Sequence, residues 1–213
     1  MQITIDKVIP VFFETTLNNG SQLWGKTVSF DRGQNIHIIA PSGSGKTSLI
    51  HFLYGLRNDY TGSISYDDNN IKHFDAEQFS VWRQKHISIV FQDLRLFTEQ
   101  TVLQNLSIKR SLYPYHATDK ITEMTRRLGI ESKLAKAVKT CSYGEQQRIA
   151  IIRALQQPFD FLLLDEPFSH LDENNRKKAM ELMEEESAAR NATIILADLR
   201  EIEYFKSEQT LHL

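Results

Sequence analysis

The hydrophobic pattern of the first 91 residues is typical of β-structure. Short apolar stretches, bounded by glycine and polar turn residues, predict strands over residues 2–8, 28–31, 35–40 and 62–66. Residues 87–91 form a further apolar run, which predicts a buried core strand. A helix is expected among these strands, through Leu49, Ile50, Phe52 and Leu53, ending near Gly55. This part of the chain therefore predicts a β-rich unit with one helix.

The pattern changes over residues 92–157, which predict mainly helix, with breaks at Pro114 and at residues 141–144. The rest of the chain predicts core strands at 159–164 and 193–197, a charged helix at 173–190 and a short β-segment at 208–213. Alternating strands and helices indicate an α/β fold with a parallel sheet. We expect a single domain, residues 1–213, with a core (1–91 and 158–213), an N-terminal antiparallel β-region and an inserted α-helical lobe at about 92–157.

Composition and charge exclude several functions. The net charge of -2 provides no basic field for nucleic acid, so no nucleic-acid partner is expected. The single cysteine, Cys141, rules out an internal disulfide and suits a reducing compartment. No stretch approaches the roughly 20 apolar residues that span a bilayer. A role at a membrane would therefore depend on a partner, and a cytoplasmic location is expected.

A Gly/Ser-rich segment lies between the strand at 35–40 and the following helix. It reads Ala40-Pro41-Ser42-Gly43-Ser44-Gly45-Lys46-Thr47, the P-loop pattern with alanine in the first glycine position. Glycines let the backbone curl so that N–H groups point at phosphate oxygens, and the helix adds its positive dipole end. The strand–turn–helix context disfavours a chance turn. We expect ATP in a cradle of Ser42, Gly43, Ser44, Gly45, Lys46, Thr47 and Ser48.

Individual side chains near this cradle suit phosphate chemistry. Lys46 is placed to neutralise the β- and γ-phosphates, and the Thr47 hydroxyl to bind Mg²⁺. The apolar run 161–164 ends in Asp165 and Glu166, at the strand end where open α/β sheets bind ligands. Adjacent strand residues point to opposite faces, so these carboxylates can have different roles. We expect Asp165 to hold Mg²⁺ and Glu166 to act as general base.

Four ordered motifs carry a resemblance to a known family. Residues 142–148, Ser-Tyr-Gly-Glu-Gln-Gln-Arg, resemble the signature motif of ABC ATPases, which usually begins Leu-Ser-Gly-Gly-Gln. Residues 91–93 resemble the Q-loop of that family, 165–167 its Walker B end and 169–172 its D-loop. The chain is therefore identified as a member of the ABC ATPases. It most resembles the small cassettes of lipoprotein-releasing, macrolide-export and cell-division complexes.

This resemblance implies a mechanism that uses two cassettes. They would pack head to tail as an ATP-dependent homodimer or heterodimer, with each ATP between one P-loop and the partner's signature motif. Ser142, Gly144 and the helix that begins near Glu145 would contact the γ-phosphate in trans. Gln92 would contact Mg²⁺ and the attacking water. The lobe, including residues 94–97, would dock on integral membrane permease subunits.

The resemblance also implies an aromatic side chain that stacks on adenine. Phe12 and Phe13 are the candidates, and Trp24 is a weaker candidate because it lies closer to the P-loop. Neighbouring side chains alternate in direction, so at most one phenylalanine should face the nucleotide. Either of them could instead be an ordinary core or strand residue.

Three positions depart from the family pattern. Ala40 would matter only if its φ were positive. Tyr143 replaces the first glycine of the signature, so it could crowd the partner's phosphate or point away. Asp198 stands where the family usually has a switch histidine, and an anion ~4 Å from the γ-phosphate at an effective dielectric near 20 is repelled by roughly 4 kcal/mol. Asp198 must then be protonated, turned away or bridged by a cation; alternatively, it caps a helix over residues 199–204.

The sequence therefore predicts an ATP-binding and hydrolysing subunit of an ABC transporter-type membrane complex, peripheral at the inner face of the cytoplasmic membrane. Its catalytic positions would be Glu166, Lys46, Gln92 and Asp198. The alternative is an ATP-responsive binding or regulatory module with weak or absent hydrolysis, which the aspartate at position 198 motivates.

Overall fold

The computed structural model describes residues 1–13 and 20–213, and two sheets organise them. The antiparallel sheet has the order β2-β1-β4-β5: β1 (Gln2–Pro10), β2 (Thr27–Asp31), β4 (Tyr60–Tyr66) and β5 (Asn69–Asn70). The parallel sheet has the order β6-β7-β8-β3-β9: β3 (Ile36–Ile39), β6 (Ile87–Val90), β7 (Phe161–Asp165), β8 (Thr193–Asp198) and β9 (Gln209–His212). The predicted α/β fold with a parallel sheet and an N-terminal antiparallel region is confirmed.

Six α-helices lie in the described residues: α1 (Lys46–Leu53), α2 (Ala76–Lys85), α3 (Val102–Leu112), α4 (Asp119–Arg127), α5 (Tyr143–Ala154) and α6 (Glu173–Ala189). Short 3₁₀ turns cover η1 (Val11–Phe13), η2 (Ile71–His73), η3 (Glu131–Lys133) and η4 (Val138–Thr140). Side chains fix several helix starts. Capping boxes join Asp75 with Gln78 and Ser142 with Glu145, and Asp172 caps α6. None of these helices is both long enough and apolar enough to cross a membrane.

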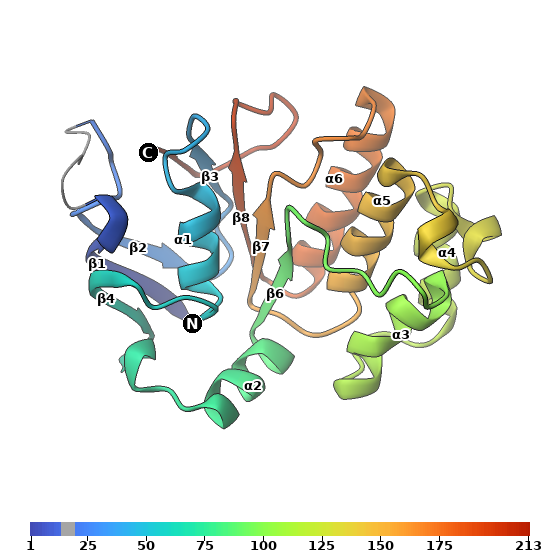
Figure 1. Ribbon diagram of the computed structural model, residues 1–213, viewed down its shortest axis with the longest axis horizontal. Helices are drawn as coiled ribbons and strands as arrows, with labels where there is room; N and C mark the ends of the chain where they lie inside the picture. The colour runs from blue at the N-terminus through green and yellow to red at the C-terminus, as the bar shows by residue number, and fades with distance from the viewer. Residues whose placement is uncertain (14–19) are drawn as a thin grey trace.

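The parallel sheet separates two apolar clusters, which explains the nearly unbroken apolar sequence of its strands. Along β7, Leu162 and Leu164 face one cluster, while Phe161 and Leu163 face the other. The first cluster contains residues of α5 and α6, and the second contains residues of α1 and the antiparallel sheet. In Figure 1, α1 and β1, β2 and β4 lie to the left of β7, and α5 and α6 to its right.

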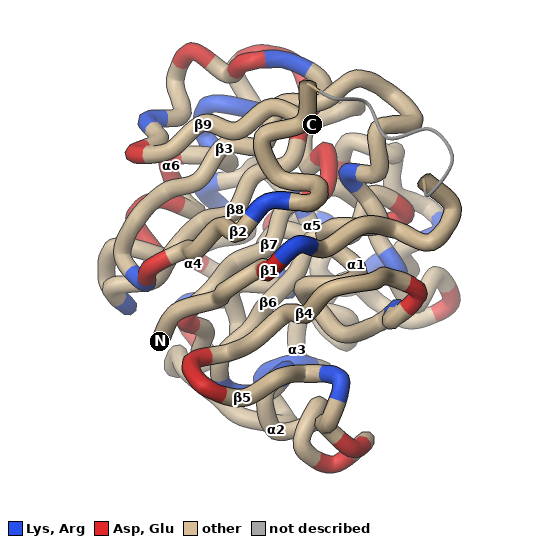
Figure 2. Tube along the Cα trace, turned by 90° about the vertical axis from the view of Figure 1, so that its left-hand side faces the viewer, with Lys and Arg blue, Asp and Glu red and all other residues tan. Residues whose placement is uncertain are grey.

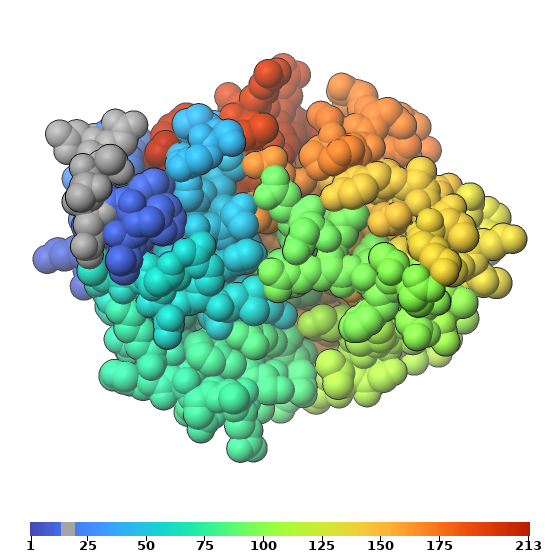
Figure 3. Space-filling model, viewed as in Figure 1, coloured from blue at the N-terminus to red at the C-terminus, as the bar shows by residue number. Residues whose placement is uncertain are grey.

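The predicted helical lobe shares its apolar cluster with the sheet. Leu106 of α3 and Met124 of α4 belong to the same cluster as Ile149 of α5 and Leu162 of β7. Figure 3 shows the green and yellow atoms of this region packed directly against the rest of the chain. The boundary of the lobe at residues 92–157 stays a prediction. Charged residues of both signs are interspersed along the trace, as Figure 2 shows.

The structure differs from the predicted elements at several points. Helix α2 and the short strand β5 were not predicted, and β1 continues to Pro10. Helix α5 begins at Tyr143, so the expected loop break at 141–144 is shorter than predicted. The alternative that Asp198 caps a helix over residues 199–204 is wrong, because these residues form bends and a turn.

Candidate functional site

Three neighbouring strands bring the predicted motifs together at one edge of the parallel sheet. The P-loop follows β3, Asp165 and Glu166 lie at the end of β7, and Asp198 ends β8. Main-chain hydrogen bonds fix this arrangement: the Ala40 N–H donates to the Asp198 carbonyl at 3.1 Å and the Glu166 N–H to the Ala197 carbonyl at 2.9 Å. Segments far apart in the sequence therefore meet at the carboxyl edge, where parallel sheets bind ligands.

The P-loop needs its two glycines. Gly43 and Gly45 have φ values of 82° and 93°, a left-handed conformation that glycine adopts without strain. A Cβ atom at Gly45 would lie 3.0 Å from the Phe13 ring and 3.1 Å from the Trp24 ring. Trp24 is buried under the loop and donates from Nε1 to the Ser44 carbonyl at 3.1 Å. Ala40 has no positive φ, so its substitution for glycine costs no strain.

A hollow of about 290 Å³ lies over the P-loop. It is lined by Phe12, Ser42, Gly43, Gly45, Lys46, Thr47, Ser48, Gln92 and Glu166. Ser44, which was also predicted to bind nucleotide, is not among the lining residues, and its hydroxyl donates to the Pro41 carbonyl at 2.7 Å. The hollow therefore gathers the P-loop, the Q-loop glutamine and the predicted general base from one chain.

Lys46 is the central cation of this hollow. Its buried ammonium donates to the Ala40 carbonyl at 2.9 Å and to the Pro41 carbonyl at 3.1 Å. It also lies 3.4 Å from Oε1 of Glu166. The predicted phosphate-binding lysine and the predicted general base thus form an ion pair.

Glu166 stands in an unusual backbone conformation. Its φ of 45° is left-handed, which costs a non-glycine residue roughly 1–2 kcal/mol. The hydrogen bond from its N–H to β8 holds this conformation. Backbone strain of this kind gathers at functional sites, so the geometry of Glu166 supports a role in chemistry.

Asp165 has the environment of a metal ligand. The residue is fully buried, and neither carboxylate oxygen has a hydrogen-bond partner in the described residues. Burial raises the pKa of Asp165 from 3.8 to about 6, with the nearby Thr47 hydroxyl opposing the shift and Glu166 adding to it. The Thr47 hydroxyl in turn lies 3.3 Å from Oε1 of Gln92. These oxygen atoms are the donors that Mg²⁺ prefers, so the residues fit that ion.

Asp198 faces away from the P-loop hollow. Its Oδ1 accepts the Leu199 N–H at 2.7 Å, and burial raises the pKa of the carboxyl. It lines a second hollow of about 360 Å³ together with Glu166, Phe168, Ser169, Arg176, Leu199, Arg200, Glu201 and Ile202. Glu166 lines both hollows. Of the options that the sequence left open for Asp198, this geometry favours a carboxylate that is turned away.

The two candidate aromatic residues lie on the 3₁₀ turn η1 and have different surroundings. Phe12 is 48% exposed and lines the P-loop hollow, whereas Phe13 packs inward, with its ring centroid 6.4 Å from that of Trp24. Sequence reasoning missed Arg57, whose Nη1 donates to the Ser48 hydroxyl at 3.1 Å and whose guanidinium lies 5.5 Å from the Phe12 ring. No motif contains Arg57, so only the fold could reveal it.

The signature residues lie apart from the P-loop hollow of the same chain. Ser142 caps α5: its hydroxyl accepts the Glu145 N–H at 3.3 Å, and the Glu145 carboxylate accepts the Ser142 N–H at 2.8 Å. Gly144 belongs to the first turn of this helix. None of the three lines the P-loop hollow of its own chain.

A phosphate cradle followed by an acidic strand end defines the class of P-loop nucleotide-binding proteins. The family model described as ABC transporter matches residues 24–169. The chain therefore belongs to the ABC transporter family, and it is an ATP-binding, ATP-hydrolysing cassette subunit of that family.

Individual relatives agree with this assignment. The lipoprotein-releasing system ATP-binding protein LolD of Buchnera aphidicola is 32% identical over 176 residues, which cover 79% of this chain and 76% of the relative. The phosphonates import ATP-binding protein PhnC of Fusobacterium nucleatum is 32% identical over 203 residues, 89% of this chain and 81% of the relative. The dimeric structure of the bacterial ABC transporter cassette MJ0796 has a TM-score of 0.79 at 21% identity, over 93% of this chain and 88% of that one.

Proposed function

We propose that the chain hydrolyses ATP in the P-loop hollow with Glu166 as general base and Lys46 as the phosphate-binding cation. The contact of 3.4 Å between these two side chains carries the proposal. An incoming triphosphate offers Lys46 more negative charge than one carboxylate does, so Lys46 exchanges partners. Glu166 is then free to accept a proton from the attacking water.

The same site holds Mg²⁺ through Asp165, Thr47 and Gln92. When bound, the ion neutralises charge on the phosphate oxygens. The buried carboxylate of Asp165, which lacks a hydrogen-bond partner in the described residues, supports this assignment. Phe12 offers its exposed ring face to adenine, while Phe13 supports the P-loop from below.

The active form is a head-to-tail dimer with a second copy or with another cassette. Support comes from the position of Ser142, Gly144 and Glu145 at the start of α5, away from their own P-loop hollow. A helix N-terminus attracts anions, and the Gly144 N–H lies in its first turn. A partner's γ-phosphate is the anion that this end of α5 would bind.

The cassette works with integral membrane permease subunits, which dock on the helical lobe at the inner face of the cytoplasmic membrane. Relatives named for lipoprotein release and phosphonate import support a membrane partner without fixing the cargo. The docking surface includes residues 94–97. Arg95 is 43% exposed, and its guanidinium lies 4.1 Å from the Phe91 ring. Arg95→Glu should weaken co-purification of the permease while ATP affinity changes less than twofold. Normal co-purification would contradict this docking site.

Phosphate release by wild type and Glu166→Gln tests the catalytic proposal. The variant keeps the shape of the side chain but cannot accept a proton, so turnover should fall by about 10²–10⁴-fold. Binding of a fluorescent ATP analogue should persist, which separates loss of chemistry from loss of the site. Equal background rates for both proteins, with the permease present, would instead favour an ATP-responsive module.

A further inference from the structure

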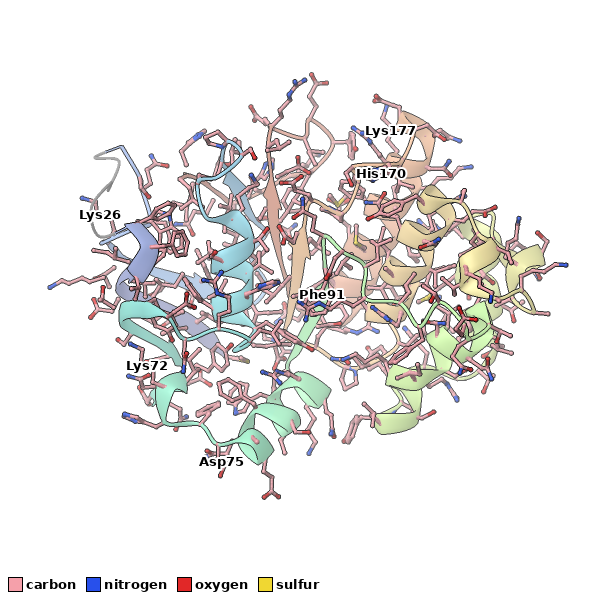
Figure 4. All side chains as sticks on the ribbon, viewed as in Figure 1. Lys26, Lys72, Asp75, Phe91, His170 and Lys177 are labelled. Atoms are coloured by element: carbon pink, nitrogen blue, oxygen red, sulfur yellow. The ribbon has the colours of Figure 1, made fainter. Side chains whose placement is uncertain are left out.

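Tyr143 contacts two loops of its own chain. The centroid of its ring lies 4.1 Å from that of the His170 ring in the D-loop, with the planes tilted by 52°. Its hydroxyl donates to the backbone carbonyl of Gln92 in the Q-loop at 3.4 Å. Figure 4 shows His170 where the loop after β7 passes the start of α5, and Phe91 on the segment that leads into Gln92. Tyr143 itself is the first residue of α5.

The D-loop is joined to α5 by further contacts. The buried Gln147 side chain donates to the Ser169 hydroxyl at 3.2 Å and accepts the His170 N–H at 3.1 Å. A Cβ atom at Gly144 would lie 2.9 Å from the His170 carbonyl, so the helix and the loop are in backbone contact. Helix α5 and the D-loop are therefore packed together. Tyr143 reaches from the start of α5 to the backbone of Gln92, and Arg153 of the same helix donates to the carbonyls of Leu94 and Arg95 at 2.6 Å.

We propose that Tyr143 is a positioning residue that couples the two nucleotide sites of the dimer. Its helix would bind the partner's ATP, while Gln92 serves the ATP of its own chain. A glycine, the usual residue at this place in the signature, could make neither side-chain contact. The inference rests on the proposed function, because α5 meets a partner's nucleotide only in a head-to-tail dimer.

The two contacts of Tyr143 differ in strength. The hydrogen bond from the Tyr143 hydroxyl to Gln92 is long, and Tyr143 is 44% exposed, so this bond is weak. The ring contact with His170 is short and adds aromatic packing. Removing the hydroxyl should therefore loosen the Q-loop slightly, and removing the whole ring should in addition loosen the D-loop.

Amide hydrogen exchange of the nucleotide-free chain tests this link directly. Tyr143→Phe and Tyr143→Ala should each speed exchange over residues 91–97 by about twofold, because both lose the hydroxyl, and Tyr143→Ala should also speed exchange over residues 169–172. Tyr113→Phe is the matched control, since Tyr113 is a tyrosine of similar exposure (45%) and should leave this segment unchanged. Unchanged exchange in Tyr143→Ala would overturn the proposal. Faster exchange throughout α5 would also overturn it, because Tyr143 would then only stabilise its own helix.

Steady-state kinetics test the coupling itself. Tyr143→Ala should lower kcat about tenfold while KM for ATP changes less than twofold, and Tyr143→Phe, which keeps the ring contact with His170 but loses the bond to Gln92, should lower kcat by a smaller factor. A fall in kcat without faster exchange at residues 91–97 would overturn the proposal, because Tyr143 would then act directly on the partner. ATP-dependent dimerisation of Glu166→Gln, measured by light scattering, distinguishes the two proposals. If Glu166→Gln does not dimerise with ATP, the proposed function is refuted. If it dimerises, but the Tyr143 variants show the hydrogen exchange and kcat of wild type, only the coupling is refuted.

Discussion

Replacing Asp165 by asparagine gives a quantitative test of the metal site. Burial raises the pKa of this carboxyl from 3.8 to about 6, so the folded chain keeps its proton at a pH where the unfolded chain has lost it. The ionised group therefore lowers stability as the pH rises from the unfolded pKa to the folded one, and the cost is complete above the folded pKa. A shift of this size corresponds to about 3 kcal/mol at pH 7 and about 1.6 kcal/mol at pH 5.

Urea denaturation with EDTA and without nucleotide measures this cost. Asparagine does not ionise, so the stability gained by Asp165→Asn should be about 1.3 kcal/mol larger at pH 7 than at pH 5. A constant cost of the buried amide cancels in this comparison. Asp68→Asn, at an exposed turn, is the matched control and should stay within about 0.5 kcal/mol at both pH values.

Ligand addition completes the assay. Mg-ATP should raise the stability of wild type and have little effect on Asp165→Asn, because binding stabilises only a site that can hold the ion. A gain from Asp165→Asn that does not depend on pH would refute the reasoning. The carboxylate of Asp165 would then be solvated in the folded chain, and no bound cation would be needed to offset its burial.

Four further substitutions probe the rest of the site and the fold. Phe12→Ala should weaken ATP binding about tenfold through loss of stacking, whereas Phe13→Ala should mainly lower the melting temperature; equal affinities for Phe12→Ala and wild type would contradict the assignment. Asp198→His should raise turnover by about tenfold or more, because the longer imidazole can extend from the second hollow past Glu166, which lines both hollows, toward the phosphate; an unchanged rate would defeat that idea. Glu186→Ala should cost about 3 kcal/mol in urea denaturation, because it leaves the buried Arg190 without its carboxylate partner at 2.6 Å; a loss below about 1 kcal/mol would contradict this.

The sequence predicted the parts of the fold that are set by local chemistry. The run 161–164 had to be a buried strand because its side chains are apolar on both faces, and the structure buries all of them. The P-loop and the acidic strand end could be placed together because parallel strands share one carboxyl edge. Helix α2 was missed because its apolar stripe is narrow: Phe79 and Trp82 pack against the second cluster but are only partly buried. Its capping box at Asp75 and Gln78 was a readable signal.

The rest of the site depends on tertiary contacts that no motif encodes. Trp24 was considered as an adenine contact, but its indole is buried and bonded to the P-loop backbone. Arg57 reaches Ser48 only because the turn after α1 brings it back beside the start of that helix. The direction of the Asp198 side chain was left open by the sequence; its contact with the Leu199 N–H and its place in the second hollow favour the turned-away option.

At Asp198, the last residue of β8, the backbone and the side chain have separate roles. The carbonyl of Asp198 receives the Ala40 N–H, and its backbone lies in register with Ile39 of β3. Every one of these bonds would survive an exchange of the side chain. A substitution at position 198 can therefore change the rate of ATP hydrolysis without disturbing the backbone that aligns the nucleotide.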